Sequence, residues 1–248
     1  MNFVFSNTTI AITHKDAASI MAEVSARLTA GEGFALATIN LDHVVKLGRD
    51  PAFLADYAAQ DIVVADGNPI VWLSRMAGKA VSLTPGSDLV LPMVRAAAAA
   101  GRPVVLLGST DDALAGAATA LRGLVPGVVI GATIAPDFGF DPKGTVAEAM
   151  LAQVAALGPC LCLIALGAPK QEALAAFGRR LAPQAGFASI GAGVDFLSGH
   201  QVRAPAWVRR IAMEWFWRMA KNPRRFGPRY IGCAAILPGQ MVAAIKQR

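Results

Sequence analysis

Polar residues suited to acid–base chemistry stand where apolar runs of the sequence end. Thr38 and Asn40 close one such run, and Asp66 closes the next. A carboxylate can take the proton of a hydroxyl group while neighbouring hydroxyl and amide groups hold that hydroxyl in place. Asp66 is therefore the candidate general base, with Thr38 and Asn40 as its orienting partners. The alternative is structural, because an Asp after a strand is also a common helix N-cap.

Glycine-containing turns follow three other apolar runs and could bring backbone N–H groups close to a phosphate or a nucleotide. The candidate phosphate- or nucleotide-binding residues are Gly108, Gly167, Lys170, Gln171, Gly191, Gly193 and Asp195. Neither Gly-x-Gly-x-x-Gly nor Gly-x-x-x-x-Gly-Lys-Ser/Thr occurs, which weakens the dinucleotide and P-loop interpretations. Each turn also has a structural explanation: a helix N-cap after Gly108, close backbone packing at Gly191 and Gly193, and a helix that starts with the solvated polar residues Lys170, Gln171 and Glu172.

Six short apolar runs alternate with Ala-rich segments of helical character, which is the pattern of a parallel sheet covered on both faces. The predicted strands cover 34–40, 62–66, 103–108, 128–133, 160–167 and 187–191. In such a sheet ligands bind beyond the carboxyl ends of the strands, so the polar and glycine-containing turns should meet at one edge. We predict a Rossmann-like, doubly wound α/β domain over residues 1–202 with a mostly parallel sheet. A small, basic, helical C-terminal appendage should follow over 203–248.

The composition points to a folded protein with an affinity for membrane surfaces. Hydrophobic residues make up 54% of the 248 residues and charged residues only 16%, which excludes a disordered chain. The three cysteines have neither disulfide nor zinc-site spacing and fit a reducing cytoplasm. The N-terminus lacks a secretory signal pattern, and we expect no transmembrane helix. Because the chain is so apolar, self-association into a homo-oligomer stays open.

Positive charge is concentrated in the predicted appendage, which carries ten Lys or Arg against the single acid Glu214. An amphipathic helix is indicated by the four-residue spacing of Trp207, Ile211, Trp215 and Met219. Cations then alternate with aromatic residues and helix breakers. Such a segment can lie on an anionic membrane or close over a diphosphate, because guanidinium groups match phosphate oxygens and Trp favours the interface. Packing on the body and plain solvated charge are the alternatives.

Several motifs occur in a fixed order along the chain: Thr38-x-Asn40, Asp66-Gly67, Gly86-x-Asp88-Leu89, Gly167-x-Pro169-Lys170-Gln171-Glu172, Gly191-x-Gly193-x-Asp195-Phe196-x-x-Gly199, Arg203-Ala204-Pro205-x-Trp207, and Glu214-Trp215-x-x-Arg218 followed by Pro223-x-Arg225. Together they resemble the WecG/TagA/CpsF glycosyltransferases over nearly the whole chain. The Gly-x-Pro-Lys-Gln-Glu signature, combined with Arg-Ala-Pro and Glu-Trp, is specific. One departure is that family members often carry an Arg shortly before the Gly-x-Asp-Leu motif, where this chain has Ser-Leu-Thr-Pro.

The resemblance implies an inverting transferase that moves a sugar from a UDP-sugar to a saccharide on a polyprenyl diphosphate lipid, in surface polysaccharide biosynthesis. The sugar would be of the N-acetylmannosamine, N-acetylmannosaminuronic acid or glucuronic acid type. The enzyme would be cytoplasmic and peripheral on the inner face of the cell membrane.

Asp66 would be the base that inversion requires. No Asp-x-Asp occurs, so we expect neither a metal nor another cofactor. The diphosphate would be neutralised by some of Arg218, Arg224, Arg225 and Arg229.

The uridine diphosphate is expected to lie between two groups of residues. Gly167, Lys170 and Gln171 would line one side, and Gly191, Gly193 and Asp195 the other. Asp195 would accept hydrogen bonds from the ribose or the uracil.

Two other function classes stay open. One is a non-catalytic nucleotide-sugar-binding or membrane-associated regulatory module, in which Asp66 is only a cap. The other is a nucleic-acid binder, which the basic appendage suggests and no RNA- or DNA-binding motif supports. We also expect the appendage to order on contact with membrane or lipid acceptor, hinged at its prolines.

Overall fold

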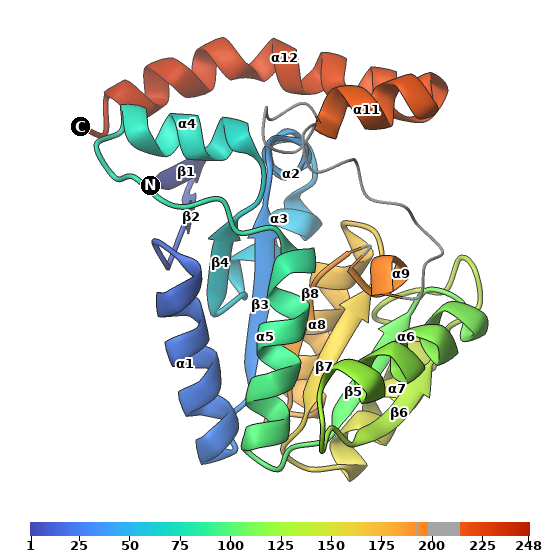
Figure 1. The fold of residues 1–248 in the computed structure, drawn as a ribbon. Helices are drawn as coiled ribbons and strands as arrows, with labels where there is room; N and C mark the ends of the chain where they lie inside the picture. The colour runs from blue at the N-terminus through green and yellow to red at the C-terminus, as the bar shows by residue number, and fades with distance from the viewer. Residues whose placement is uncertain (192, 198–213) are drawn as a thin grey trace.

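Six parallel strands form the central sheet, in the order β4-β3-β8-β7-β5-β6 (Figure 1). The computed structural model describes residues 1–191, 193–197 and 214–248, without the side chains of 195, 196, 214, 215, 218, 221 and 225. The strands are β3 (Phe34–Ile39), β4 (Ile62–Ala65), β5 (Val104–Gly108), β6 (Ile130–Ile134), β7 (Leu161–Ala165) and β8 (Gly186–Ser189). Each lies at a predicted apolar run. The predicted doubly wound α/β fold with a mostly parallel sheet is confirmed.

Helices cover both faces of this sheet, as the fully apolar strands require. They are α1 (Ala17–Ala30), α2 (Leu41–Leu47), α3 (Pro51–Ala58), α4 (Asn68–Met76), α5 (Gly86–Ala99), α6 (Asp111–Leu124), α7 (Thr145–Ala156), α8 (Lys170–Leu181) and α9 (Gly193–Leu197). Helices α1, α5 and α6 lie in front of the sheet in Figure 1 and pack on Leu36, Leu106 and Leu163. Helices α7 and α8 pack on the other face, against residues such as Val105 and Ile164. Every residue of β3, β5 and β7 is therefore buried.

A β-hairpin at the N-terminus was not predicted. Strands β1 (Asn2–Phe5) and β2 (Thr8–Ala11) pair antiparallel, with Ser6 in the turn at φ 48°. Phe3 and Ile10 face the core, where they join a third apolar cluster with residues of α2, α3 and α4. The hairpin thus closes the end of the molecule near β4.

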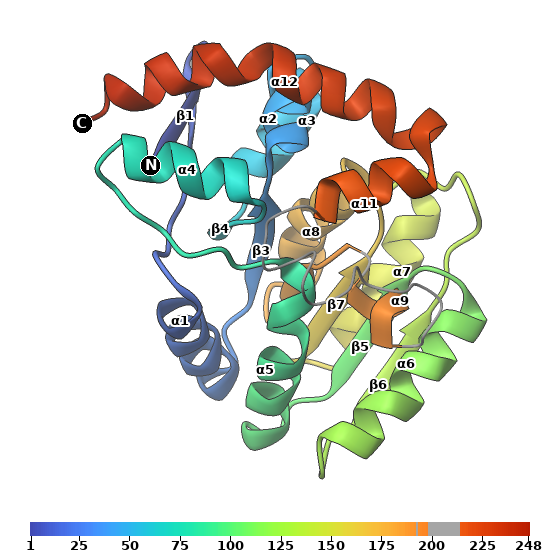
Figure 2. The same cartoon turned by 45° about the horizontal axis from the view of Figure 1, so that its top comes forward.

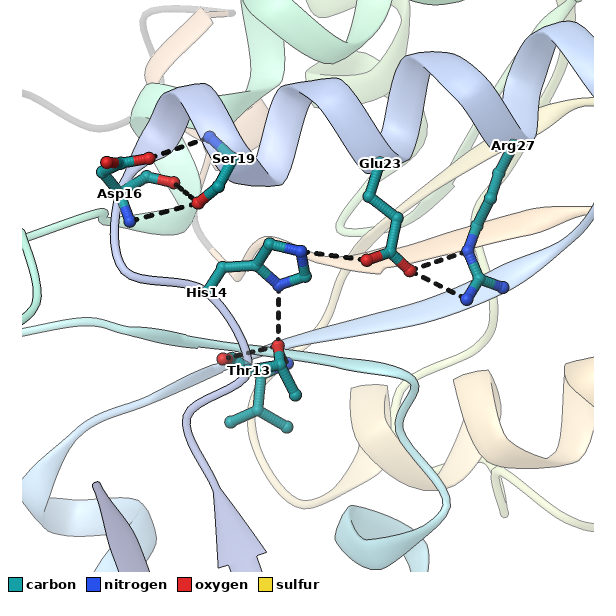
Figure 3. Close-up of polar contacts among 7 residues, drawn as sticks. Thr13, His14, Asp16, Ser19, Glu23 and Arg27 are labelled. Atoms are coloured by element: carbon teal, nitrogen blue, oxygen red, sulfur yellow. Dashed lines mark hydrogen bonds and ion pairs between the residues drawn. The ribbon is translucent and has the colours of Figure 1, made fainter.

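The segment after the hairpin is fastened to the sheet and to α1 (Figure 3). Thr13 exchanges three hydrogen bonds with the backbone of Val63 in β4. Asp16 then begins α1 with a capping box, because its carboxylate accepts the Ser19 N–H and the Ser19 hydroxyl accepts the Asp16 N–H. The edge strand β4 is therefore covered on its outer side by an N-terminal segment rather than left open.

The C-terminal residues form two helices, α11 (Glu214–Lys221) and α12 (Pro223–Ile245). Both lie across the end of the molecule to which the strands point (Figures 1 and 2). Helix α12 contacts α2 and α4 and buries Cys233 and Ala244. The side chain of Gln247 exchanges two hydrogen bonds with the backbone of Asn2, at 2.9 and 2.7 Å, which ties the two ends of the chain together.

Helix α12 departs from the predicted helix-breaking pattern, since it runs through both Pro228 and Pro238. Each proline removes one backbone hydrogen bond, and contact with α2 and α4 supports the flanking turns.

Trp207 and Ile211 of the predicted amphipathic helix lie outside the described residues, as does the side chain of Trp215. None of the described helices combines the length and the apolar character that crossing a bilayer requires.

Candidate active site

The carboxyl ends of β3 and β4 bring the three predicted catalytic residues to one place. Thr38 is the penultimate residue of β3, Asn40 follows that strand, and Asp66 follows β4. The two strand ends are joined directly, because the Asp66 N–H donates a hydrogen bond to the carbonyl of Ile39 at 2.8 Å. A Cβ placed on Gly67 would lie 3.7 Å from the Asn40 Cβ. Asn40 and the Asp66-Gly67 turn are therefore neighbours.

Asp66 is half-buried and stands one residue before the N-cap of α4. The cap position belongs to Gly67, whose φ of +102° is open to glycine and strained for other residues. Asp66 therefore does not occupy the cap position that the structural alternative assigned to it. Burial, then the charge of Glu172, then that of Asp66 raise the pKa of the Tyr57 hydroxyl well above its usual value. The Asp66 carboxylate thus lies within electrostatic reach of Tyr57.

A buried polar cluster fixes the backbone at the end of β3. The Thr38 carbonyl accepts a hydrogen bond from the Tyr57 hydroxyl at 2.6 Å and lies 2.7 Å from His43 Nδ1. Burial lowers the pKa of His43 to about 4, so its ring is neutral near pH 7. Nδ1 must then carry a proton, because a carbonyl can only accept. Asn40 also caps α2, its Oδ1 accepting the His43 N–H at 3.1 Å.

The start of α5 closes on the same edge of the sheet. A Cβ placed on Gly86 would lie 3.1 Å from the Ile190 Cα and 3.3 Å from Thr38 Cγ2. Only a glycine fits this approach without displacing its neighbours, so the glycine of the Gly-x-Asp-Leu motif brings α5 against the ends of β3 and β8. The methyl group of Thr38 faces this helix.

The turn after β7 contains the predicted nucleotide-binding residues Gly167, Lys170 and Gln171. The three differ in exposure and in the residues that they contact. Gly167 is exposed, and a Cβ on it would meet no atom within 4 Å. Lys170 turns toward the loop between β6 and α7, where Nζ donates to the Phe140 carbonyl at 2.7 Å. Gln171 is buried, and its Oε1 accepts the Gly191 N–H at 3.1 Å. Gln171 therefore connects the turns that follow β7 and β8.

Glu172 is fully buried beside Gln171, so the alternative of a solvated helix start is wrong for these two residues. Its Oε1 accepts a hydrogen bond from Gln171 Nε2 at 2.8 Å, and among the described residues its Oε2 has no hydrogen-bond partner. Burial raises the pKa of the Glu172 carboxyl to about 7, against the lowering effect of the Gln171 hydrogen bond. The charge of Lys46 lowers this pKa and that of Asp56 raises it. A carboxyl group that titrates near neutrality thus lies behind the site.

Three of the predicted glycines have structural roles, close packing at Gly108 and Gly193 and a left-handed backbone at Gly191. Gly108 has φ +105°, and a Cβ there would lie 2.5 Å from the Ala165 carbonyl oxygen. Thr110 caps α6 two residues later, as the structural alternative predicted. Gly191 adopts the left-handed region at φ +58°, and a Cβ on Gly193 would lie 3.0 Å from Val90 Cγ2. Nucleotide binding by these turns stays a prediction.

The predicted diphosphate-binding arginines divide into two groups. Arg229 of α12 is half-buried and its Nε lies 3.2 Å from Oδ2 of Asp42 in α2, while Arg224 is exposed. The side chains of Arg218 and Arg225 lie outside the described residues, as does that of Asp195, whose backbone is in α9. Across the described side chains, no group of three or more His, Cys, Asp or Glu is placed to hold a metal ion.

Sequence reasoning missed the residues that surround the site from α2 and α3. His43 and Tyr57 belong to no motif, and their importance follows from contacts with a backbone carbonyl, which leave no mark in the sequence. Lys46 follows Asp42 by four residues and pairs with it at 2.9 Å, a spacing that is visible in the sequence. These residues support the edge of the sheet at which the predicted catalytic residues meet.

Comparison with protein families gives one match that covers almost the whole chain. The model of the glycosyl transferase WecG/TagA/CpsF family matches residues 5–248. It includes the strand ends that carry Thr38, Asn40 and Asp66, the turn with Gln171 and Glu172, and both C-terminal helices. The chain belongs to the WecG/TagA/CpsF family of glycosyltransferases.

Proposed function

We propose that this glycosyltransferase moves a sugar from a UDP-sugar, with inversion at the anomeric carbon, to a saccharide carried on a polyprenyl diphosphate lipid. The donor sugar would be of the N-acetylmannosamine, N-acetylmannosaminuronic acid or glucuronic acid type. Because the acceptor is a membrane lipid, the enzyme would act at the inner face of the cell membrane, in surface polysaccharide biosynthesis. The observation that carries the catalytic part is the joined end of β3 and β4, with the Asp66 N–H on the Ile39 carbonyl at 2.8 Å.

In this proposal Asp66 is the general base. Its carboxylate takes the proton of the acceptor hydroxyl while the hydroxyl oxygen forms a bond to the anomeric carbon of the donor sugar. The bond from that carbon to the UDP oxygen breaks on the opposite face, and UDP leaves with the bonding electrons. Asn40 and Thr38 orient the reacting hydroxyls from the neighbouring strand end. The neutral His43 and Tyr57 hold the Thr38 backbone from behind.

The departing diphosphate gains negative charge, which cations of the C-terminal helices would stabilise. Arg224 of α12 is a described candidate for this role, because its side chain is exposed and available to a ligand. The exposed turn at Gly167 leaves room for the nucleotide, and Gln171 would act by holding the Gly191 turn in place. We expect transfer to proceed without a metal ion.

Replacing the base tests the proposal directly. Asp66→Asn keeps the side-chain volume and removes the proton acceptor, so sugar transfer should fall by about a hundredfold to ten-thousandfold. UDP binding should stay within about twofold, because the base does not hold the nucleotide. The assay is UDP release from a panel of UDP-sugars with a polyprenyl diphosphate saccharide, in the presence and absence of EDTA.

The matched control is Asp112→Asn, an exposed carboxylate in the first turn of α6 that should leave transfer unchanged. An Asp66→Asn variant that keeps more than a tenth of wild-type transfer would remove Asp66 from the mechanism. A wild-type protein that binds UDP-sugars and transfers none would favour the non-catalytic binding module. Loss of transfer with EDTA would overturn the expectation of metal independence.

A further inference from the structure

A pocket of about 410 Å³ lies between α2, the start of α3 and helix α12, apart from the Asp66 turn. Its walls are partly apolar, with Val45, Phe53, Pro169 and Pro228. Three cationic side chains line it as well: Lys46, Arg49 and Arg229. Sequence reasoning assigned no role to Lys46 of α2 or to Arg49, which follows that helix.

The charges of this pocket are not balanced by its two carboxylates. Asp50 is the N-cap of α3, and its Oδ1 already accepts the N–H groups of Ala52 and Phe53. Asp42 serves two cations at once, since its Oδ2 lies 2.9 Å from Lys46 Nζ and 3.2 Å from Arg229 Nε. Arg49 is exposed and has no ion pair among the described residues.

The cations also keep donors that an anion could reach. The side chains of Lys46 and Arg229 are 39% and 35% exposed, so neither is sealed inside the protein. A guanidinium group offers five N–H donors, and Arg229 Nε lies 3.2 Å from Asp42 Oδ2 without forming a hydrogen bond to it. Cations above apolar walls are suited to a phosphoryl group joined to a hydrocarbon chain.

We propose that this pocket binds the diphosphate of the lipid-linked acceptor, through Lys46, Arg49 and Arg229. The inference rests on the proposed function and adds a second phosphoryl subsite to it. The diphosphate of the donor is bonded to the reacting carbon, so it must lie next to that carbon, on the side that faces away from Asp66. The diphosphate of the acceptor is separated from the reacting hydroxyl by at least one sugar. A pocket on the α12 side of α2, two residues along the chain from Asn40, fits this displacement.

The test measures binding of the full-length protein to geranyl diphosphate, and separately to UDP, by titration calorimetry without turnover. Arg49→Gln and Lys46→Met should each weaken geranyl diphosphate binding by about tenfold, because each removes a charged donor. UDP binding should stay within about twofold of wild type. Arg122→Gln on α6 is the matched control, an exposed arginine away from the pocket that should change neither affinity. Circular dichroism checks that each variant is folded.

Equal geranyl diphosphate affinity in wild type and both pocket variants would overturn the proposal. A loss confined to UDP would overturn the assignment to the acceptor, because the pocket would then hold the donor diphosphate. Since no transfer is measured, neither outcome depends on Asp66 as the base. Failure of the Asp66→Asn prediction and failure of this one are therefore distinguishable.

Discussion

Around the candidate base, single residues combine a structural contact with a proposed chemical role. Asn40 caps α2 and also faces the Asp66-Gly67 turn. Gln171 holds the Gly191 turn through one end of its amide and contacts Glu172 through the other. Such double use explains why the structural and the functional interpretations of these residues were both open in the sequence. The contacts define the structural role of each residue, and rate measurements on variants test its chemical role.

Glu172 gives a prediction about stability and pH. Its carboxyl has a folded pKa of about 7 against an ordinary value of 4.5, so the folded protein binds this proton more tightly than the unfolded chain does. The free energy of unfolding should therefore fall as the pH rises from about 4.5 through about 7, because the buried carboxylate forms at a cost. Glu172→Gln removes this cost. Relative to wild type, the variant should gain about 2 to 3 kcal/mol between pH 5 and pH 8.

Urea unfolding at the two pH values measures this difference. Glu148→Gln, an exposed position in α7, is the control and should show the same difference from wild type at pH 5 and pH 8. If the Glu172→Gln variant also differs from wild type by one constant amount, the carboxyl does not titrate in this range. Comparing variants cancels the other titrating groups that both proteins share.

At the scale of elements, the sequence predicted the central sheet well because buried parallel strands are short, continuous apolar runs. All six predicted runs contain a strand, and their carboxyl ends meet at one edge, as the positions of Asp66 and Asn40 required. The β1–β2 hairpin was harder to predict, because its strands are only four residues long and are partly exposed. Val4, for example, is apolar and yet 68% exposed. The course of α12 could not be derived, because its path depends on contacts such as Arg229 with Asp42, which are distant in sequence.

The C-terminal helices give a prediction about domain organisation. Deleting residues after Ala204 should leave a folded α/β body, because the clusters on both faces of the sheet contain no residue of α12. The melting temperature should drop by several degrees, since α12 covers α2 and α4 and buries Cys233 and Ala244. Sugar transfer should be lost along with the cations of α12.

Thermal unfolding followed by circular dichroism and UDP release measure the two effects separately. Cooperative unfolding without transfer agrees with a body and an appendage that completes the active site. Full transfer by the truncated protein would exclude the C-terminal helices from catalysis. A truncated protein without a cooperative transition would mean that α12 belongs to the body itself.

At the scale of the whole molecule, the C-terminal part of the chain combines cations with exposed apolar residues such as Phe216 and Ile231. The net charge of +6 arises from the last part of the chain, where residues 203–248 carry ten cations and one acid. Helix α12 forms the outer layer beyond the carboxyl ends of the strands (Figure 2). The pocket between α2 and α12 and the Asp66 turn both lie on this side of the sheet. A molecule that receives a lipid-linked acceptor from a membrane would be expected to present this side to it.

The outward face of α12 gives the prediction that tests this orientation. Cys233 and Ala244 are buried on the inner side of this helix, whereas Ile231, Val242 and Ile245 are 73%, 55% and 57% exposed. An apolar stripe flanked by cations is typical of a helix that lies in the membrane interface. The protein should therefore float with vesicles containing phosphatidylglycerol and much less with phosphatidylcholine alone, and added salt should weaken binding. Because both positions are exposed, the double variant Val242→Asp with Ile245→Asp should fold normally.

That double variant should lose most of its vesicle binding, since two carboxylates would enter the interface beside anionic lipids. Val146→Asp is the control, because Val146 is 50% exposed and belongs to α7 rather than to the C-terminal helices. Flotation of the double variant at the wild-type level would show that another surface holds the membrane. Transfer to a short-chain, water-soluble acceptor should survive in the double variant, because the substitutions leave the pocket between α2 and α12 intact. The membrane contact and the chemistry can in this way be measured apart.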